Sequence, residues 1–235
     1  MNARFGHLPH ERAAAMIQAQ LGQDVAVTSC TTDAYPVGLL PPEEAAMAGA
    51  SPARRREFTA GRVIARQAMA TLRRPQMAVP QSPDRAPIWP DGLVGSISHC
   101  KLACVAALAP ATRISALGID LEPNIALDAD LVDIICTKSE RNWLATLDRP
   151  NRDVLAKLIF SAKESVFKCQ YPLSKAMLEF HDIELRLDLA RHQFEARFLT
   201  DADPFLANSA LPGKFAMDAD HITTTVSIHI AEAPA

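Results

Sequence analysis

The order of helix-like and strand-like segments is the feature that most constrains the fold of this chain. Periodicity predicts helices over residues 9–21, 52–72, 127–147 and 151–171. Strand-like runs lie between and after them, over residues 24–30, 92–99, 114–123, 181–189, 192–199 and 222–230. Helices between groups of strands indicate an α+β fold of two comparable halves, which we expect to divide into residues 1–115 and 116–235.

Prolines mark several of the predicted boundaries. Ser51 and Pro52 suit the N-cap and first position of a helix that stops before Pro75. Residues 75–93 contain five prolines, which predicts loop or extended chain. The last predicted helix opens at Asn151 and is closed by Pro172. Residues 102–109 are a short apolar run that fits a buried strand or a short buried helix equally well.

Composition limits the classes of protein to which this chain can belong. It has 235 residues, of which 49% are hydrophobic and 22% charged, as in ordinary soluble domains. Its longest apolar run is too short to span a bilayer, and its N-terminus lacks the apolar core of a secretory signal. We therefore expect a cytoplasmic protein that does not enter membranes. The cysteines lack zinc-site spacing and should be reduced, mostly buried thiols: Cys30, Cys100, Cys104, Cys136 and Cys169.

Charge is unevenly distributed along the chain. The formal net charge is −3, yet the segment from Arg54 to Arg74 alone carries +6, which leaves −9 for the other residues. A local basic segment on an otherwise acidic protein favours an anion site over a nucleic-acid surface.

The basic segment coincides with the predicted helix over residues 52–72. On such a helix Arg55, Arg62, Arg66 and Arg73 fall within a stripe about 40° wide, which is compatible with a solvated basic face. However, residues 54–56 are three arginines in the first turn, where the helix dipole favours negative charge. Arginine side chains are suited to phosphate, so a bound phosphate is the alternative interpretation.

Two carboxylates alternate on the predicted strand over residues 114–123. Asp120 and Glu122 point to the same face of that strand. They could form the polar face of a half-exposed strand, or they could bind Mg²⁺, which prefers oxygen ligands. Their neighbours Gly118, Ile119 and Leu121 indicate a mostly buried strand, on which two carboxylates would repel each other unless a cation lay between them.

Two further segments could carry chemistry. In FSAKESVFK, residues 160–168, Glu164 and Lys168 stand four apart, which suits either a surface ion pair or a reaction centre. Ser98 and His99 follow a strand, where the imidazole could make a local hydrogen bond or contact a phosphate. A serine hydrolase is poorly supported, because no Gly-x-Ser-x-Gly motif surrounds Ser98.

Four motifs, taken together in this order, resemble one enzyme family. They are RRREFTAGRVIARQAM, PIWPDGLVGSISHC, GIDLEP and FSAKESVFK, and the similarity runs from about residue 50 to residue 172. The chain resembles the phosphopantetheinyl transferases of the enterobactin-synthesis and surfactin type. The resemblance implies a pseudo-dimer of two similar α+β halves in one chain, with coenzyme A in the cleft between them. It also implies a monomer.

The resemblance implies a specific reaction. Members of this family move the 4′-phosphopantetheine arm of coenzyme A to a serine of an apo carrier protein and release adenosine 3′,5′-bisphosphate, with Mg²⁺. The carrier could serve siderophore, other peptide-synthetase, polyketide or fatty-acid synthesis. Two alternatives stay open: a Mg²⁺-dependent phosphohydrolase of coenzyme A or nucleotides, and a non-catalytic module that binds a carrier or a nucleotide.

The resemblance also implies roles for individual residues. Asp120, Glu122 and Glu164 would bind Mg²⁺, and Glu164, or a water that it orients, would be the catalytic base. His99 and Lys168 would add positive charge in catalysis. The coenzyme would be held by Arg54, Arg55, Arg62, Ser98, His99, Lys163 and Lys168, with the turn Arg85, Ala86 and Pro87 along the adenine. That turn often begins with glycine in relatives, whereas Arg85 stands here.

Overall fold

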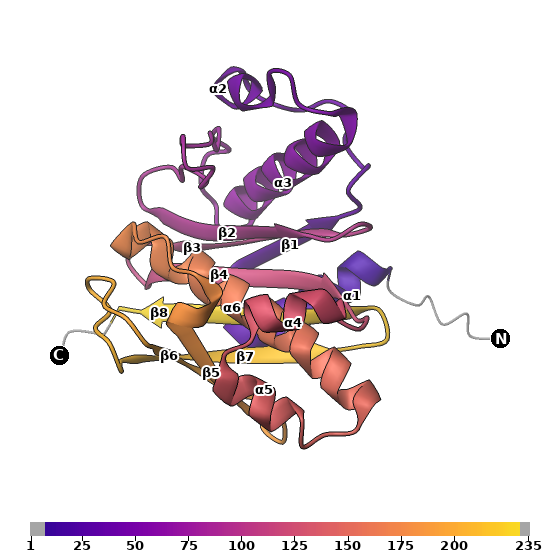
Figure 1. The fold of residues 1–235 in the computed structure, drawn as a ribbon. Coiled ribbons are helices and arrows are strands. Elements are labelled where there is room, and N and C mark those ends of the chain that lie inside the picture. The colour runs from indigo at the N-terminus through magenta and orange to yellow at the C-terminus, as the bar shows by residue number, and fades with distance from the viewer. Residues whose placement is uncertain (1–7, 231–235) are drawn as a thin grey trace.

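The structure is a computed structural model that describes residues 8–230. It contains two antiparallel sheets that meet along one edge (Figure 1). The first sheet has the order β1-β3-β2, with β1 Ala26–Cys30, β2 Leu93–His99 and β3 Cys104–Pro110. The second has the order β4-β8-β7-β6-β5, with β4 Ile114–Pro123, β5 Ile183–Asp188, β6 Gln193–Phe198, β7 Ala210–Met217 and β8 His221–His229.

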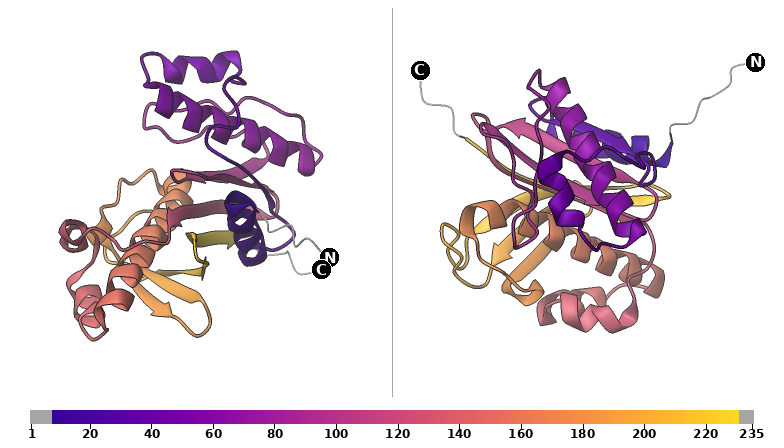
Figure 2. Two further views of the ribbon diagram at one scale, coloured as in Figure 1. Left: turned by 90° about the vertical axis from the view of Figure 1, so that its right-hand side faces the viewer. Right: turned by 90° about the horizontal axis from the view of Figure 1, so that it is seen from above.

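One long helix covers each sheet. Helix α3, Pro52–Thr71, packs on β1 and β3, and helix α6, Arg149–Ser174, packs on β4 and β8 (Figures 1 and 2). Helix α1, Pro9–Leu21, contacts β1 and β8 and so packs against both sheets. This arrangement confirms the predicted α+β fold with two similar halves, whereas the predicted division after residue 115 stays a prediction.

Alternation along β4 places its side chains in two different layers. Leu117, Ile119 and Leu121 belong to the apolar cluster beneath α1, and Ala116 belongs to the cluster beneath α6. Since the side chains of a strand alternate between its faces, the even-numbered Asp120 and Glu122 share the side of Ala116 and face α6. Both predicted metal ligands of the strand therefore lie toward the same helix.

The two sheets are joined by serine side chains. The hydroxyl of Ser96 on β2 accepts a hydrogen bond from the backbone N–H of Ile119 at 3.1 Å, and that of Ser98 accepts one from Leu121 at 3.2 Å. These bonds satisfy backbone groups at the edge where β2 meets β4. They bring the motif that ends in His99 beside the strand carboxylates.

Gly118 allows α6 to lie directly on β4. A Cβ atom at this position would overlap the carbonyl oxygen of Ser165 and stand 2.7 Å from the backbone nitrogen of Cys169. Only glycine permits so close an approach of two backbones. The helix segment that carries Glu164 and Lys168 is thereby held against the strand that carries the carboxylates.

Two predicted helices differ in the structure. The single helix expected over residues 127–147 is wrong: it is two short helices, α4 Ala129–Ile135 and α5 Lys138–Leu144. The break follows Cys136, whose backbone is extended, because Thr137 starts α5 as an N-cap in a capping box with Glu140. Helix α6 starts at Arg149 and ends at Ser174, two residues past Pro172, whose missing N–H costs the helix one hydrogen bond in its last turn.

The C-terminal part contains four strands where the sequence predicts three. Strand β7 escapes prediction because Pro212 and Gly213 are typical of turns. In the structure Gly213 leaves room for the ring of Phe194, which would overlap any Cβ atom at that position. Residues 104–110, for which strand and helix were both open, form the buried central strand of the first sheet.

The remaining elements are short. Helix α2, Pro41–Glu44, and the 3₁₀ turn Ala45–Met47 precede α3, and a second 3₁₀ turn, Phe180–Asp182, precedes β5.

Across residues 8–230 no helix has the length and apolar character needed to cross a membrane. The five cysteines are free thiols, four of them buried.

Candidate functional site

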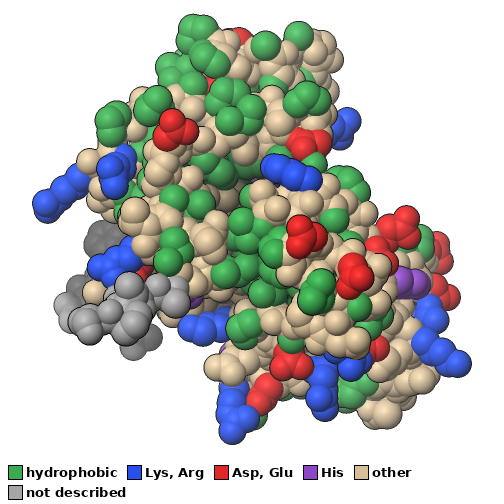
Figure 3. Space-filling model, turned by 90° about the vertical axis from the view of Figure 1, so that its left-hand side faces the viewer, with side chains coloured by type: hydrophobic (Ala, Val, Ile, Leu, Met, Phe, Trp, Pro, Cys, Tyr) green, Lys and Arg blue, Asp and Glu red, His purple; other side chains and the backbone are tan. Residues whose placement is uncertain are grey.

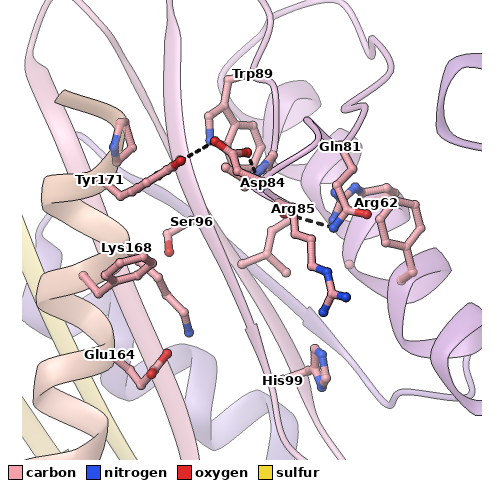
Figure 4. A pocket seen from close by; sticks show the side chains of 18 of the residues that line it. Arg62, Gln81, Asp84, Arg85, Trp89, Ser96, His99, Glu164, Lys168 and Tyr171 are labelled. Atoms are coloured by element: carbon pink, nitrogen blue, oxygen red, sulfur yellow. Dashed lines mark hydrogen bonds between the residues drawn. The ribbon is translucent and has the colours of Figure 1, made fainter. Parts of the chain in front are cut away.

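A cavity of about 350 Å³ opens where α3, the loop before β2, strand β2 and α6 meet (Figure 4). In the space-filling view, hydrophobic side chains gather in the crease between the upper and lower parts of the molecule (Figure 3). Eight residues predicted to form the site line the cavity: Arg54, Arg62, Arg85, Ala86, Pro87, His99, Glu164 and Lys168. Three of the four sequence motifs thus line one cavity, and the fourth, GIDLEP, lies behind its wall, where Asp120 contacts Lys168.

Asp120 is the most buried carboxylate of the site, with 3% of the residue exposed. Its Oδ1 atom accepts hydrogen bonds from the ammonium of Lys168 at 2.6 Å and from the hydroxyl of Ser98 at 2.9 Å. Its Oδ2 atom is buried and has no hydrogen-bond partner. An unpartnered buried carboxylate oxygen is costly, which indicates that a cation or another donor belongs there.

Glu122 is half-buried on the same face of β4. Burial and the neighbouring charge of Asp120 raise the pKa of Glu122. The ammonium of Lys157 opposes this shift, since it donates to Oε2 of Glu122 at 2.9 Å. Lys157 was not among the residues predicted for the site.

Glu164 reaches the cavity from α6. Burial raises its pKa, and the charges of Asp120 and Glu122 raise it further, against the influence of Lys168. Among the residues that the structure describes, its carboxylate forms no ion pair or hydrogen bond. Glu164 is therefore the carboxylate of this group that is free to accept a proton or to bind a cation.

Lys168 lies between the carboxylates. Burial alone would lower its pKa, but Asp120, Glu164 and Glu122 outweigh that effect and raise it. Its ammonium therefore stays charged at neutral pH, beside a cavity that also holds arginines.

The carboxylates fit a hard divalent cation. The charge of Asp120 raises the pKa of both glutamates, and one buried oxygen of Asp120 lacks a partner. An oxygen donor set of this kind suits Mg²⁺. In residues 8–230 no three His, Cys, Asp or Glu side chains form a ready-made metal group, and each of the two strand carboxylates pairs with a lysine.

Cations line the opposite wall of the cavity. Nη1 of Arg54 lies 3.4 Å from Nε2 of His99, and Glu57 lies 3.9 Å from both side chains. Burial, Arg54 and Lys168 together lower the pKa of His99 against the influence of Glu57. This wall is suited to an anion, which would relieve the mutual repulsion of its cations.

Arg62 combines a structural contact with a place in the cavity. Its Nε donates to the carbonyl of Val79 at 2.8 Å, and its guanidinium lies 3.9 Å from the ring centroid of Phe58. Burial lowers its pKa to about 10, so it remains charged at neutral pH. Because Val79 precedes the Arg85 turn, Arg62 also anchors the loop that carries that turn.

The turn predicted to lie along an adenine closes one end of the cavity. Arg85 has φ +70°, a left-handed conformation that glycine adopts most easily. Asp84 accepts hydrogen bonds from Ser82 and from Tyr171 of α6, which lower its pKa to about 2. The Tyr171 contact ties the loop of the first half to the helix of the second (Figure 4).

Three predicted coenzyme ligands have other partners in the structure. Lys163 is buried and donates all three of its bonds at 2.8 Å, to Glu140 and to the carbonyls of Ile135 and Phe180. The Ser98 hydroxyl is occupied by Asp120 and β4. Arg55 pairs with Glu44 and does not line the cavity. For these side chains the implied phosphate contact stays a prediction, and in the structure their polar groups have other partners.

Two structural features beside the cavity were not predicted from the sequence. Lys157 could have been found, because it lies seven residues before Glu164 and so on the same helical stripe. The buried pair of Arg66 and Glu43, 2.7 Å apart, gave no local signal. Glu43 also accepts from the N–H of Val79 at 2.8 Å, so this pair holds the loop that leads to the Arg85 turn.

Comparison with known proteins identifies related sequences. Residues 42–109 match a family model described as the N-terminal domain of 4′-phosphopantetheinyl transferase. Residues 116–226 match a second model, described as the 4′-phosphopantetheinyl transferase superfamily. The two matches together include α3, α6 and all the carboxylates of the cavity.

Individual relatives carry the same description. The 4′-phosphopantetheinyl transferase Svp of Streptomyces mobaraensis is 43% identical over 84% of this chain and 82% of its own length. The 4′-phosphopantetheinyl transferase PptT of Mycobacterium tuberculosis is 32% identical over 80% of this chain and 82% of its own. Enterobactin synthase component D of Salmonella typhimurium is 40% identical over 49% of this chain and 47% of its own.

Proposed function

The chain belongs to the 4′-phosphopantetheinyl transferase family, and from this premise we propose that it transfers 4′-phosphopantetheine from coenzyme A to a serine of an apo carrier protein, with Mg²⁺. It is a phosphopantetheinyl transferase enzyme. The proposal adds the metal, the by-product adenosine 3′,5′-bisphosphate and the residues that act.

The observation that carries the proposal is the pairing of two unlike walls around one cavity. One wall presents the cations Arg54 and Arg62 together with the imidazole of His99, and the other presents Glu164 and Lys168 beside the strand carboxylates. Transfer from a pyrophosphate to a hydroxyl needs cations along the pyrophosphate oxygens and an acceptor for the proton of the hydroxyl. The cavity supplies both.

In the proposed reaction, the serine oxygen of the carrier forms a bond to the β-phosphorus of coenzyme A. The bond from that phosphorus to the adenosine 3′,5′-bisphosphate breaks, and the bisphosphate leaves with the bonding electrons. Glu164, whose pKa is raised, accepts the serine proton, either directly or through a water that it orients. Lys168 and His99 stabilise the negative charge that grows on the phosphate oxygens.

The carboxylate group would hold the metal. Asp120, Glu122 and Glu164 are the ligands that we assign to Mg²⁺, because the charge of Asp120 raises the pKa of both glutamates and because Asp120 has an unpartnered oxygen. When bound there, Mg²⁺ would neutralise charge on the pyrophosphate. Ser98 and Lys168 orient Asp120 from the other side through its Oδ1 atom.

The remaining coenzyme contacts follow from the cavity wall. We assign the phosphates to Arg54, Arg62, His99 and Lys168, and the adenine to the turn formed by residues 85–87. The relatives named for enterobactin synthesis support carrier proteins of siderophore or other secondary-metabolite pathways as acceptors. We further propose a monomeric, cytoplasmic enzyme, since the two halves of one chain complete the cavity.

One experiment tests the proposed reaction. The protein is incubated with coenzyme A, Mg²⁺ and several apo carrier proteins, and each carrier is weighed by mass spectrometry. We expect a mass increase of one phosphopantetheine on at least one carrier. No increase on any carrier would overturn the transferase proposal. Release of phosphopantetheine without a carrier would support the phosphohydrolase, and coenzyme binding without chemistry would support the binding module.

The role of Glu164 has its own test. Glu164→Gln keeps the size of the side chain but removes the proton acceptor, so transfer should slow about 10²- to 10⁴-fold. Coenzyme A affinity, measured by calorimetry, should change little. Glu195→Gln, an exposed change on β6, is the matched control and should transfer normally. Full turnover by Glu164→Gln would remove Glu164 from the mechanism.

A further inference from the structure

Three charged side chains of α6 form one stripe along the helix. Lys157, Glu164 and Lys168 are separated by seven and then four residues, which places them within about 40° of one another around the axis. Helix α6 lies on β4, and the even-numbered carboxylates of that strand face it. The stripe therefore stands opposite Asp120 and Glu122.

Each strand carboxylate is paired with one lysine of the stripe. Lys168 binds Oδ1 of Asp120 at 2.6 Å, and Lys157 binds Oε2 of Glu122 at 2.9 Å. Each pair uses one oxygen of the carboxylate. Glu164 stands between the two lysines in the helix and forms no such pair among the described residues.

The pair of Lys157 and Glu122 is not an ordinary surface ion pair. The two side chains are 14% and 19% exposed, so solvent screens their attraction only weakly. The ammonium of Lys157 also lies 5.2 Å from the ring centroid of Phe160, on the same helix. Ring and carboxylate together fix the position of this lysine.

We propose that Lys157 is a positioning residue of the cation site, which holds Glu122 in a fixed orientation while leaving its second carboxylate oxygen to a divalent cation. The inference rests on the proposed function, because it takes Asp120, Glu122 and Glu164 as the cation ligands. Its physical basis is that two carboxylates on one strand face repel each other and turn apart unless a partner fixes each one. Groups that hydrogen-bond to a metal ligand commonly change metal affinity when they are lost.

Direct binding of Mn²⁺ tests the inference without any turnover. Free Mn²⁺ is measured by electron paramagnetic resonance during titration of the full chain. Lys157→Met removes the ammonium but keeps a long side chain, and its affinity for Mn²⁺ should fall about tenfold. Lys157→Arg, which can still donate to Glu122, should bind within about threefold of the native protein. Lys138→Met removes a lysine from the exposed start of α5 and should leave the affinity unchanged.

Steady-state kinetics separate positioning from a general loss of structure. In Lys157→Met the KM for Mg²⁺ should rise about tenfold, while kcat at saturating Mg²⁺ and the KM for coenzyme A stay close to native. A variant that is merely unstable would instead lower kcat at all Mg²⁺ concentrations and would show a lower Tm.

The possible outcomes are distinct. If the native chain binds Mn²⁺ and Lys157→Met binds it equally or more tightly, the role of Lys157 is overturned. The metal assignment itself would stand. The metal assignment of the proposed function fails if the native chain shows no saturable Mn²⁺ binding, or if that binding survives Asp120→Asn. The role of Lys157 then fails with it. Transfer of phosphopantetheine, measured separately on the carrier, would still decide the reaction.

Discussion

Helices α3 and α6 occupy similar places on their sheets but carry opposite chemistry. Each is long, and each packs on the strands of its own half. Helix α3 presents arginines to the cavity, whereas α6 presents a carboxylate and a lysine beside the acidic strand β4. In the proposed function, the pseudo-dimer thus places the wall assigned to phosphates opposite the wall assigned to the metal, which one symmetric pair of helices could not provide.

Both helices also contain a buried cation with a structural role. Arg66 of α3 binds Glu43 at 2.7 Å, and Lys163 of α6 binds Glu140 at 2.8 Å. Each pair ties its helix to a neighbouring helix of the same half, and removal of one partner would leave a buried charge unpaired. A shared residue type along a helix therefore does not imply a shared function.

The two helices differ in how closely they approach their sheets. Gly61 lies on helix α3, and a Cβ atom there would stand 3.0 Å from Cγ2 of Ile97, which is a side-chain and not a backbone atom. Gly118 lies on the strand beneath α6, and a Cβ atom there would overlap backbone. Close backbone contact is thus essential in the half that carries the carboxylates, and optional in the other.

The largest expected effect comes from substitution of these glycines. Gly118→Ala should lower the free energy of unfolding by more than about 3 kcal/mol, because helix backbone must move away from β4. Gly61→Ala should change it by less than about 1 kcal/mol, since the better helix propensity of alanine offsets a mild contact. Urea denaturation measures both values. Similar stabilities for the two variants would show that the halves are packed alike.

Sequence could predict most elements and the two walls of the cavity. The periodicity of α3 and α6 is long and regular, and Asp120 and Glu122 on one strand face follow from alternation alone. It could not divide residues 127–147 into two helices, because the break depends on a capping box whose Glu140 is held by Lys163 of α6.

The sequence could not show which arginines and lysines of each helix remain available to a ligand. Arg55 and Lys163 look equivalent to Arg54 and Lys168 in the motifs, yet their partners, Glu44 and Glu140, come from other segments. Which side chain remains available to a ligand is thus decided by tertiary contacts that no local pattern records.

The second expected effect separates two adjacent arginines of α3. Arg54 lines the cavity beside His99, whereas Arg55 pairs with Glu44. Arg54→Ala should raise the KM for coenzyme A roughly tenfold, as expected when a charged hydrogen bond is lost, with little change in kcat. Arg55→Ala should change the KM less than about twofold. An equal loss in the Arg55 variant would restore the coenzyme role that its place in the motif implies.

A smaller effect is expected at the contact that crosses between the halves. Tyr171 of α6 donates to Asp84 of the loop that closes the cavity. Tyr171→Phe keeps the ring that stacks on Phe167 but removes this bond, so coenzyme A should dissociate about fivefold faster. Stopped-flow displacement measures the rate. Tyr35→Phe removes a surface hydroxyl bonded to Gln67 and should not change it. Unchanged release from the Tyr171 variant would mean that the two halves hold the coenzyme independently.

The smallest expected effect is a pH dependence that arises where the two walls meet. Burial, Arg54 and Lys168 lower the pKa of His99, so its imidazole is neutral at neutral pH in the free protein. A phosphate beside it would stabilise the protonated form and raise that pKa, so binding should take up a proton in the pH range between the two values. Coenzyme A should therefore bind about threefold more tightly at pH 6.5 than at pH 8.

Calorimetry in two buffers of different ionisation enthalpy measures the proton uptake directly. The coenzyme's own 3′-phosphate also titrates near pH 6 and releases its proton to solvent when it binds beside cations, so native protein and His99→Gln must be compared at each pH. The difference in proton uptake between the two proteins gives the contribution of the imidazole. If both take up the same number of protons, His99 does not bind the phosphate, and the cationic wall consists of the arginines and Lys168 alone.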